Sequence, residues 1–439
     1  MDREFVIRAA SLYGPVTLAL LLWYWRRPSV RAWAGMLVGW VWNASALLAL
    51  NVIAQRVGWW HFEAQRALFF GMPIESYLGW TVLWGMLPQL AFPREPLPAA
   101  LAFFVAFDFL FMPKMAPVLV LGGRWWVGEC VGLAGGLLPA MLVSRWTARQ
   151  ERLYWRAGTQ FVAFAALTLW LLPSVIFAAR AQRWPQFPLR SWFVLVQFVC
   201  LAGLPGVAAV HEFEVRGRGT PLPYDPPSRL VITGPYAYVA NPMQMGAALV
   251  LVAWGIGLRS GWVALAGVMA HVYSAGLANW DEREDLSARF GEPWRRYRRE
   301  VRNWFPRWKP YVASPGELYV SETCGMCSEV KRWCERRGAT GLEIRAAESY
   351  PGRLMRITYV HADGETESGI AAMARAVEHI NLAWAYAGWC ARLPVIKQTL
   401  QVLVDACGGG PREMAEGGPE SQSQNKTKQI PRGLSVRSW

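Results

Sequence analysis

The chain has 439 residues, of which 54% are hydrophobic and only 17% charged, and its formal net charge is +14. This balance is typical of a protein that is partly surrounded by lipid, so it argues against a purely soluble enzyme. Most of the positive excess is arginine in short runs between apolar stretches, where basic residues orient membrane helices more often than they bind nucleic acid. We therefore expect an integral, multi-pass membrane protein with no nucleic-acid partner.

Seven apolar segments long enough for a hydrocarbon core of about 30 Å follow one another from the N-terminus, and an eighth and a ninth follow as a closely spaced pair. They cover residues 5–25, 32–54, 73–92, 99–121, 125–146, 159–179, 191–210, 244–258 and 262–278. Only three residues join the last two, which predicts a helical hairpin. The fourth contains Asp108, Pro113 and Lys114, so a kink or break is expected there, with the two charged residues forming an intramembrane polar site, pairing or snorkelling. The predicted fold is an α-helical polytopic membrane protein with about nine transmembrane helices.

Basic residues of the short loops predict the orientation. Arginine clusters at residues 26–31, 145–156 and 295–302 follow the first, fifth and ninth segments. With nine helices these clusters fall on one side of the membrane together with the loop at 211–242, and the positive-inside rule makes that side cytoplasmic. Met1 is then expected outside, although Arg180, Arg183 and Arg190 fall on the opposite side in this scheme.

The composition changes after residue 310. A charged segment to about residue 410 is predicted to form a small cytoplasmic α/β domain, followed by a tail with too few apolar residues to fold. The expected elements are strands at 317–320, 342–346 and 356–360, helices at 328–337 and 367–380, and a turn at Asp363-Gly364. The predicted division is a helical region of unknown role (1–210), a loop, hairpin and cytoplasmic helix (211–310), an α/β domain (315–410) and a disordered tail (411–439).

The most informative motifs flank the predicted hairpin. Before it, Gly234-Pro235-Tyr236-Ala237-Tyr238 is followed by Asn241-Pro242 and Gly246; after it come Asp281-Glu282, Phe290-Gly291 and Tyr297. Residues 217–310 thereby resemble the isoprenylcysteine carboxyl methyltransferase and phospholipid methyltransferase superfamily of integral membrane enzymes. The resemblance implies an S-adenosylmethionine-dependent methyltransferase whose acceptor is a membrane lipid or a lipidated molecule.

The physical demands of this reaction suit the same stretch. S-adenosylmethionine is polar and cationic at sulfur, so it is held at the water side while an apolar acceptor enters from the bilayer. Glycine and proline permit close backbone approach, the rings of Tyr236 and Tyr238 can face a sulfonium, and an acidic helix end can bind ribose hydroxyls. Alignment of acceptor, methyl and sulfur is then the main catalytic requirement.

The resemblance implies the residues of the predicted methyl-transfer site. It assigns cofactor binding to Tyr238, Asn241, Pro242, Gly246 and Glu282, and the chemistry of the sulfonium adds the ring of Tyr236. Glu282 is also the candidate catalytic carboxylate, since it could accept a proton from an amine acceptor. Taken alone, Glu282, Glu284 and Asp285 are better interpreted as a solvated helix end, but their position after the turn motif favours a functional role for Glu282.

Other polar or glycine-containing motifs are assigned to structure. Gly255-Ile256-Gly257 lies inside an apolar segment and is interpreted as helix packing. His211 and His271 lack metal-ligand spacing, so they are interpreted as a loop residue and a bundle residue, and no metal is expected.

A cysteine pair, Cys324-Gly325-Met326-Cys327, follows a predicted strand and opens a predicted helix, whose N-terminus would stabilise a thiolate. Residues 318–412 resemble the thiol-disulfide oxidoreductase family named for its Asp-Cys-Cys signature. The resemblance implies a thioredoxin-like domain in which Cys324 and Cys327 are redox-active toward a thiol partner. A zinc half-site or two buried thiols remain alternatives. Cys334 is interpreted as a core residue.

Three further functions compete with the methyltransferase. One is an NADPH-dependent membrane reductase of the sterol-reductase-like type, since such proteins share a related terminal region. A second is a membrane-anchored thiol-disulfide oxidoreductase whose helices only localise it, and a third is a binding scaffold whose transfer site has decayed. Cofactor binding separates them, because only the methyltransferase is expected to retain S-adenosylmethionine.

Overall fold

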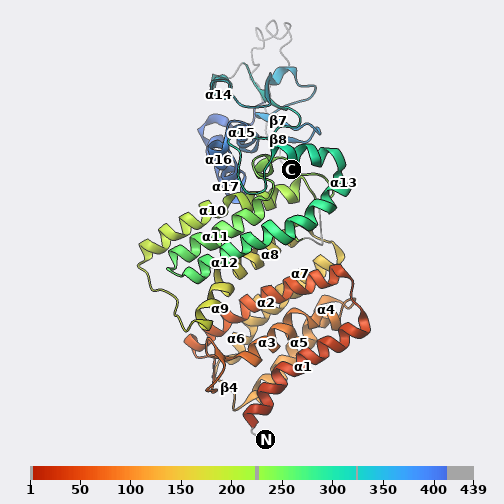
Figure 1. Ribbon diagram of the computed structural model, residues 1–439, viewed down its shortest axis with the longest axis vertical. Coiled ribbons are helices and arrows are strands. Elements are labelled where there is room, and N and C mark those ends of the chain that lie inside the picture. Colours follow the sequence, from red (N-terminus) through yellow and green to blue (C-terminus); the bar gives the residue numbers. More distant parts are fainter. Residues whose placement is uncertain (1–2, 223–226, 323–324, 413–439) are drawn as a thin grey trace, which may run out of the picture. The chain divides into compact units, whose positions relative to one another are not determined.

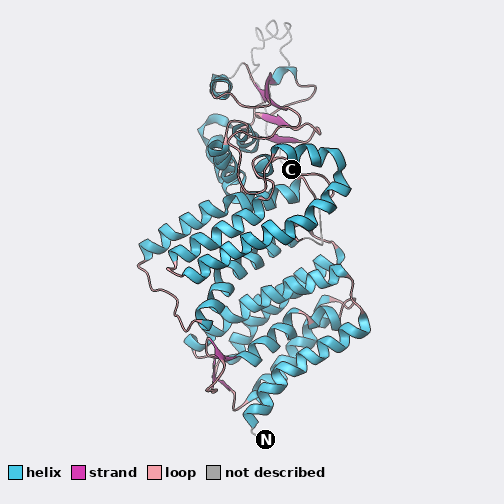
Figure 2. Ribbon diagram, viewed as in Figure 1, coloured by secondary structure: helices cyan, strands magenta, loops and turns pink. Residues whose placement is uncertain are grey.

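The structure is a computed structural model that describes residues 3–222, 227–322 and 325–412. It is built mostly from helices, with small sheets (Figures 1 and 2). Its internal contacts divide the chain into two units, Met1–Arg307 and Trp308–Trp439. Each unit is described by itself below. Most of the tail at 411–439, from residue 413 onward, lies outside the described residues.

Unit 1 is a helical bundle. Its helices are α1 (Arg3–Arg26), α2 (Val30–Val57), α3 (Ile74–Gly85), α4 (Leu87–Ala91), α5 (Leu97–Phe111), α6 (Trp125–Gly132), α7 (Leu138–Arg149), α8 (Leu153–Ala166), α9 (Leu172–Ala179), α10 (Leu189–Val215), α11 (Pro242–Gly257), α12 (Gly261–Tyr273) and α13 (Asn279–Glu300). Two short antiparallel strand pairs complete it: β1 (Trp60–Phe62) with β4 (Leu119–Leu121), and β2 (Leu68–Phe69) with β3 (Met72–Pro73).

Six helical stretches of the described chain are long and apolar enough to cross a membrane. They are Arg3–Arg26, Val30–Val57, Leu97–Met115, Trp125–Arg149, Leu153–Ala179 and Leu189–Val215. The other three expected segments coincide with shorter helices: α3 with α4, α11, and α12. On α10 the side chains of Phe193, Phe198 and Leu201 are more than half exposed, and such apolar faces are stable against lipid. The expectation of a helical, membrane-embedded protein is therefore supported.

Prolines explain why two long stretches contain wider turns. The π-helical segments η2 (Leu133–Leu137) and η3 (Leu167–Leu171) each come just before a proline at the second position of the next helix, Pro139 and Pro173. Proline has no backbone N–H and its ring collides with the carbonyl four residues earlier, so a wider turn lets the helix continue.

The fourth apolar segment breaks at Pro113 as expected. After α5, the chain forms the 3-10 turn η1 (Met112–Met115) and then strand β4. Asp108 is fully buried and accepts a hydrogen bond from the Trp84 indole at 2.8 Å, whereas the exposed Lys114 lies over the Phe111 ring, 5.1 Å from its centroid. The pairing of Asp108 with Lys114, one of the expected alternatives, is therefore wrong.

The hairpin of α11 and α12 packs through small residues, and α10 packs beside it (Figure 1). A Cβ at Gly255 would collide with the backbone of Ala264 on α12, and one at Gly257 with the Leu195 side chain on α10. The packing interpretation of Gly255 and Gly257 is confirmed. The expected loop boundary at His211 is wrong, because α10 continues to Val215 and its last turn packs Phe213 against Tyr236.

Unit 2 contains a four-stranded sheet with helices. The strands are β5 (Gly316–Val320), β6 (Leu342–Ala346), β7 (Thr358–Val360) and β8 (Thr366–Ser368), and the helices are α14 (Gly325–Arg336), α15 (Ile370–Glu378), α16 (Leu382–Arg392) and α17 (Pro394–Val404). The strand order is β6-β5-β7-β8, with β5 parallel to β6 and the other pairs antiparallel.

The predicted α/β pattern of unit 2 is confirmed in most elements. One is wrong: the helix expected at 367–380 begins only at Ile370, because Thr366–Ser368 pairs with β7 after the Asp363-Gly364 turn. Gly369, with φ +62°, ends that strand in a conformation that favours glycine. Cys334 is fully buried beside Leu318, which confirms its assignment to the core.

Candidate functional site

The predicted methyl-donor turn forms a 3-10 turn, η4 (Gly234–Ala237), followed by α11, in unit 1. Gly234 has φ +61°, in the left-handed region that favours glycine. A Cβ there would also lie 3.1 Å from Cδ of Glu212 on α10. The backbone conformation therefore favours glycine at the start of the turn, and the close Glu212 side chain leaves little room for a Cβ.

The segment after the hairpin returns to this turn. The Tyr297 hydroxyl donates to the Tyr236 carbonyl oxygen at 2.8 Å, and the Arg307 amide donates to the Tyr238 carbonyl oxygen at 3.0 Å. Gly291 makes this return possible, because its φ of +57° and ψ of −130° interrupt α13 with a kink that L side chains rarely adopt. Two motifs that the sequence places some 60 residues apart are thus in direct contact.

Two further backbone hydrogen bonds extend the same junction. The Ala240 amide donates to the Arg302 carbonyl oxygen at 2.9 Å, and the Asn241 amide donates to the Asn303 carbonyl oxygen at 3.3 Å. Because the four bonds span residues 236–241 on one side and 297–307 on the other, the turn has a fixed position relative to the segment after α13.

The two predicted tyrosines lie in the protein interior. Tyr236 is 8% exposed and Tyr238 is completely buried. The ring of Tyr236 lies 6.0 Å from that of Phe213, centroid to centroid. Both residues therefore hold the turn in place, and contact of their ring faces with a sulfonium stays a prediction.

Asn241, Pro242 and Gly246 lie at the beginning of α11. Asn241 precedes the helix, and its Nδ2 is buried with no hydrogen-bond partner among the described residues. Pro242 occupies the first helical position, where a missing N–H costs nothing. Gly246 is a packing position: a Cβ there would lie 2.9 Å from the Gly206 amide nitrogen on α10. Of the three, Asn241 supplies the donor that a ligand could use.

The remaining predicted residues are described only in part. Glu282 lies within α13, but its side chain is outside the described part of the structure. Cys324 lies outside the described residues, and so does the side chain of Cys327, whose backbone belongs to α14. The described part of the motif begins with α14 at Gly325, so the backbone of Cys327 lies in the first turn of a helix.

Glu212 is a site residue that sequence reasoning missed. Its side chain is completely buried, and its Oε1 accepts a short hydrogen bond from the Thr233 hydroxyl, next to Gly234. The available signal was an acidic residue at the end of a long apolar helix, where burial of a carboxylate needs compensating donors.

Unit 2 has its own buried polar network. Glu367 accepts hydrogen bonds from Arg375 at 2.8 Å and Arg392 at 3.4 Å, and its Oε1 is 3.0 Å from His361 Nε2. Burial opposes ionisation of this carboxylate, but the two arginines and the histidine outweigh it and hold the pKa of Glu367 well below its usual range. Burial, together with the positive charge of Arg375, lowers the pKa of His379 to about 4.

Within the described residues, no three His, Cys, Asp or Glu side chains come together as a group that could hold a metal ion. Comparison of the chain with protein-family models, curated proteins and solved structures finds no match.

Proposed function

We propose that the protein is an integral-membrane, S-adenosylmethionine-dependent methyltransferase acting on a lipid or another membrane-embedded acceptor. The observation that carries this proposal is the junction of four hydrogen bonds between residues 236–241 and 297–307. Each stretch contains residues of the motif that resembles the membrane methyltransferases, and the junction brings these residues together, which supports a common site.

The residues at the junction fit the proposed cofactor. Nδ2 of Asn241 is a buried donor without a partner among the described residues, and it lies at the N-terminus of α11, where unpaired backbone amides favour an anion. A carboxylate or a ribose hydroxyl can accept from both kinds of donor. S-adenosylmethionine would supply an electrophilic methyl group, and the chain would hold and align it, with Glu282 as a further contact.

The acceptor would reach this site from the bilayer. Helices α10 and α11 carry outward apolar side chains, including Phe198 and Ile256, which are 62% and 69% exposed. A lipid chain can lie along such a surface while its head group meets the cofactor at the wet end of the helices. This division of polar and apolar reactants supports a lipid or lipidated acceptor.

The proposed topology has nine spanning helices, Met1 outside, and everything after residue 280 in the cytoplasm. It is supported by the arginine clusters and by the need to reach the cofactor from the cytosol. Impermeant thiol labelling of intact cells tests it: a cysteine introduced into the tail at 411–439 should stay unlabelled, and labelling there would contradict the scheme.

Unit 2 is proposed to be an appended, thioredoxin-like thiol-disulfide oxidoreductase domain. Its support is the β5-α14-β6 arrangement, in which parallel strands flank a helix that begins within the Cys-x-x-Cys sequence. The same observation keeps a membrane-anchored oxidoreductase as the alternative function for the whole chain.

Isothermal titration of the purified full chain with S-adenosylmethionine and, separately, with NADPH distinguishes the proposals. Binding of the former alone supports the methyltransferase, binding of NADPH supports the reductase, and binding of neither leaves the oxidoreductase. Glu282→Ala should weaken S-adenosylmethionine binding about tenfold if one charge-assisted hydrogen bond is lost. Glu292→Ala is the matched control, because among the described residues that exposed glutamate pairs with Arg295 and Arg299 on its own helix.

A further inference from the structure

Two buried carboxylates lie in the part of unit 1 that methyl transfer does not use. Asp108 of α5 is 0% exposed and Glu129 of α6 is 2% exposed. One oxygen of each, Asp108 Oδ1 and Glu129 Oε1, is buried without a hydrogen-bond partner among the described residues. A buried carboxylate without compensation is costly. An occupant that brings positive charge and donors would therefore stabilise this region.

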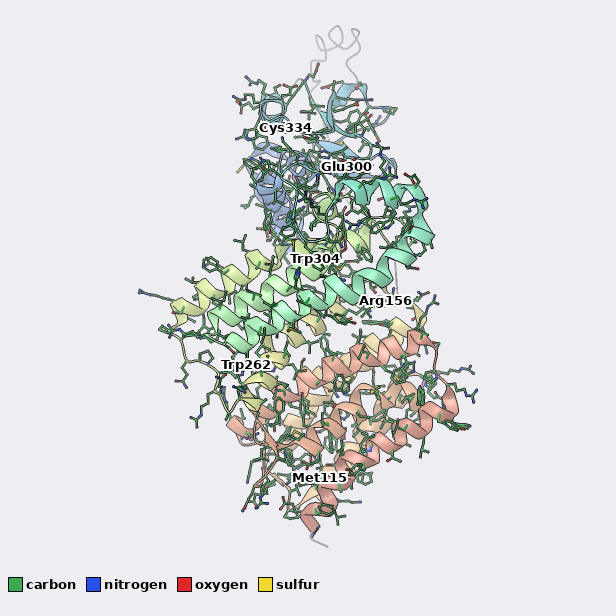
Figure 3. All side chains as sticks on the ribbon, viewed as in Figure 1. Met115, Arg156, Trp262, Glu300, Trp304 and Cys334 are labelled. Carbon is green, nitrogen blue, oxygen red and sulfur yellow. The ribbon has the colours of Figure 1, made fainter. Side chains whose placement is uncertain are left out.

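Glu129 lines a cavity of about 30 Å³ that α2, α3, η1, β1 and β4 also border. Met115, labelled in Figure 3, belongs to the same wall. The second polar wall residue is Asn51, whose Nδ2 donates to the Phe70 carbonyl oxygen at 2.9 Å, which leaves its buried Oδ1 without a partner among the described residues. Both polar groups that face the cavity therefore offer acceptors.

The rest of the wall is apolar and strongly aromatic, with the indoles of Trp60, Trp80 and Trp84. Indole faces attract cations, and the effect is largest where water is excluded. The volume admits about two water-sized groups, which limits the occupant to a small ion or the head of a longer molecule.

Asp108 does not line the cavity, but it contacts Trp84, which does. The Trp84 indole N–H donates to Asp108 Oδ2 at 2.8 Å, which fixes the ring that lines the cavity. Asp108 is in this sense a positioning residue for the cavity.

The two acceptor oxygens of the cavity determine which kind of cation fits it best. Metal cations such as Ca²⁺ and Mg²⁺ need six or more oxygen ligands, and protein side chains supply only those of Glu129 and Asn51 here. A quaternary ammonium has charge but no N–H donor. A primary ammonium has both, with three donors for the two free oxygens and an alkyl group that can contact the indoles.

We propose that this cavity binds a primary alkylammonium group, with Glu129 as its counter-ion and Asn51 as its second acceptor. The group could belong to a free amine or to the amino head group of a lipid, since the recognising chemistry is the same. This proposal does not depend on the methyltransferase, because none of its residues belongs to the junction around Tyr236.

The test uses the full chain in nanodiscs of phosphatidylcholine, which carries no primary amine. Saturation-transfer NMR at pH 7.5 should detect transfer from the protein to the methyl protons of methylammonium, and n-butylammonium should compete. Tetramethylammonium should bind at least tenfold more weakly. Phosphatidylethanolamine added to the nanodiscs should abolish the methylammonium signal if the source is a lipid and leave it unchanged if the source is a free amine.

Two variants make the test specific. Glu129→Gln keeps the side-chain shape and should lower methylammonium affinity at least tenfold. Glu75→Gln is the matched control, because Glu75 is already paired with Arg8 at 3.0 Å and should not affect binding. The proposal is overturned if wild-type protein shows no methylammonium signal, or if a folded Glu129→Gln protein, eluting as a monodisperse peak with an unchanged circular-dichroism spectrum, binds it as well as wild type.

Discussion

The hydroxyl of Tyr297 donates a hydrogen bond to the carbonyl oxygen of Tyr236 at 2.8 Å, and both residues are buried. The bond joins α13 to the turn before α11 across 61 positions of sequence. Its removal takes one donor away from a buried carbonyl oxygen, which costs about 1 kcal/mol. The proposed cofactor site therefore depends on a residue that need not touch the cofactor.

Tyr297→Phe is expected to lower S-adenosylmethionine affinity about three- to tenfold, because about 1 kcal/mol of turn stability is lost while the ring still packs. Isothermal titration measures the affinity. Tyr154→Phe is the control, since that tyrosine is exposed on α8. Equal affinities in wild type and Tyr297→Phe would show that the junction does not contribute to cofactor binding.

Asn241→Asp replaces the free Nδ2 donor by an acceptor of the same shape. If Nδ2 donates to the cofactor, affinity for S-adenosylmethionine should fall at least tenfold, since a donor is lost and a negative charge faces an acceptor. Asn381→Asp provides the control, because Asn381 only caps α16 through its side-chain oxygen, which aspartate also supplies. An unchanged affinity of Asn241→Asp would remove Asn241 from the site.

The lowered pKa of His379 predicts that unit 2 loses stability in mild acid. Its Nδ1 lies 2.8 Å from the Thr340 carbonyl oxygen and its Nε2 lies 2.9 Å from the Tyr359 hydroxyl, an arrangement that the neutral ring satisfies. Because burial lowers its pKa from 6.5 to about 4, the unfolded chain binds a proton in this interval that the folded chain does not. Stability should therefore be full above pH 6.5 and fall by about 2 kcal/mol by pH 5.

The measurement is the urea dependence of Cys334 modification by dithiodipyridine in the full chain, read from the Cys334 peptide by mass spectrometry. Cys334 is suitable because it is completely buried in unit 2. His379→Asn keeps a donor toward Thr340 but does not titrate, so the loss between pH 7.5 and pH 5 should be largely absent. His61→Asn, at an exposed histidine of unit 1, should retain it. If His379→Asn shows the same loss of stability in acid, another titrating group causes it.

Glu367 contributes only at lower pH, because its pKa is depressed and its stabilisation is lost as pH falls below about 4.5.

Cys324 and Cys327 are predicted to interconvert between dithiol and disulfide, with Cys324 the more nucleophilic. The unpaired amides at the start of α14 favour a thiolate at the first cysteine. In the reduced full chain, Cys324 should react with iodoacetamide at pH 7 several times faster than the exposed Cys407, and mild oxidant should link it to Cys327. A Cys324 pKa near the ~8.5 of an ordinary thiol, with no such disulfide, would argue for a binding module instead.

Much of the fold was predictable because it depends on local pattern. Apolar runs located most helices of unit 1, and β-rich runs with turn residues located β5, β6, β7 and the turn after β7. The helix expected at 367–380 fails in its first residues, since pairing of Thr366–Ser368 with β7 overrides a helical preference. The end of α10 was misplaced for the opposite reason: polar residues at 211–215 look like a loop but continue the helix.

The sequence by itself determined the membrane class of the protein, the break at Pro113, the helical hairpin of α11 and α12, and the motifs at 234–246 and 290–301, because these rest on composition and short-range spacing. Tertiary structure alone decided which of these meet. It paired Tyr236 with Tyr297, placed Glu212 beside Gly234, and put Trp84, instead of Lys114, against Asp108. The periodicity of the sequence does not predict such contacts. They arise because side chains must pack and because buried polar groups need hydrogen-bond partners.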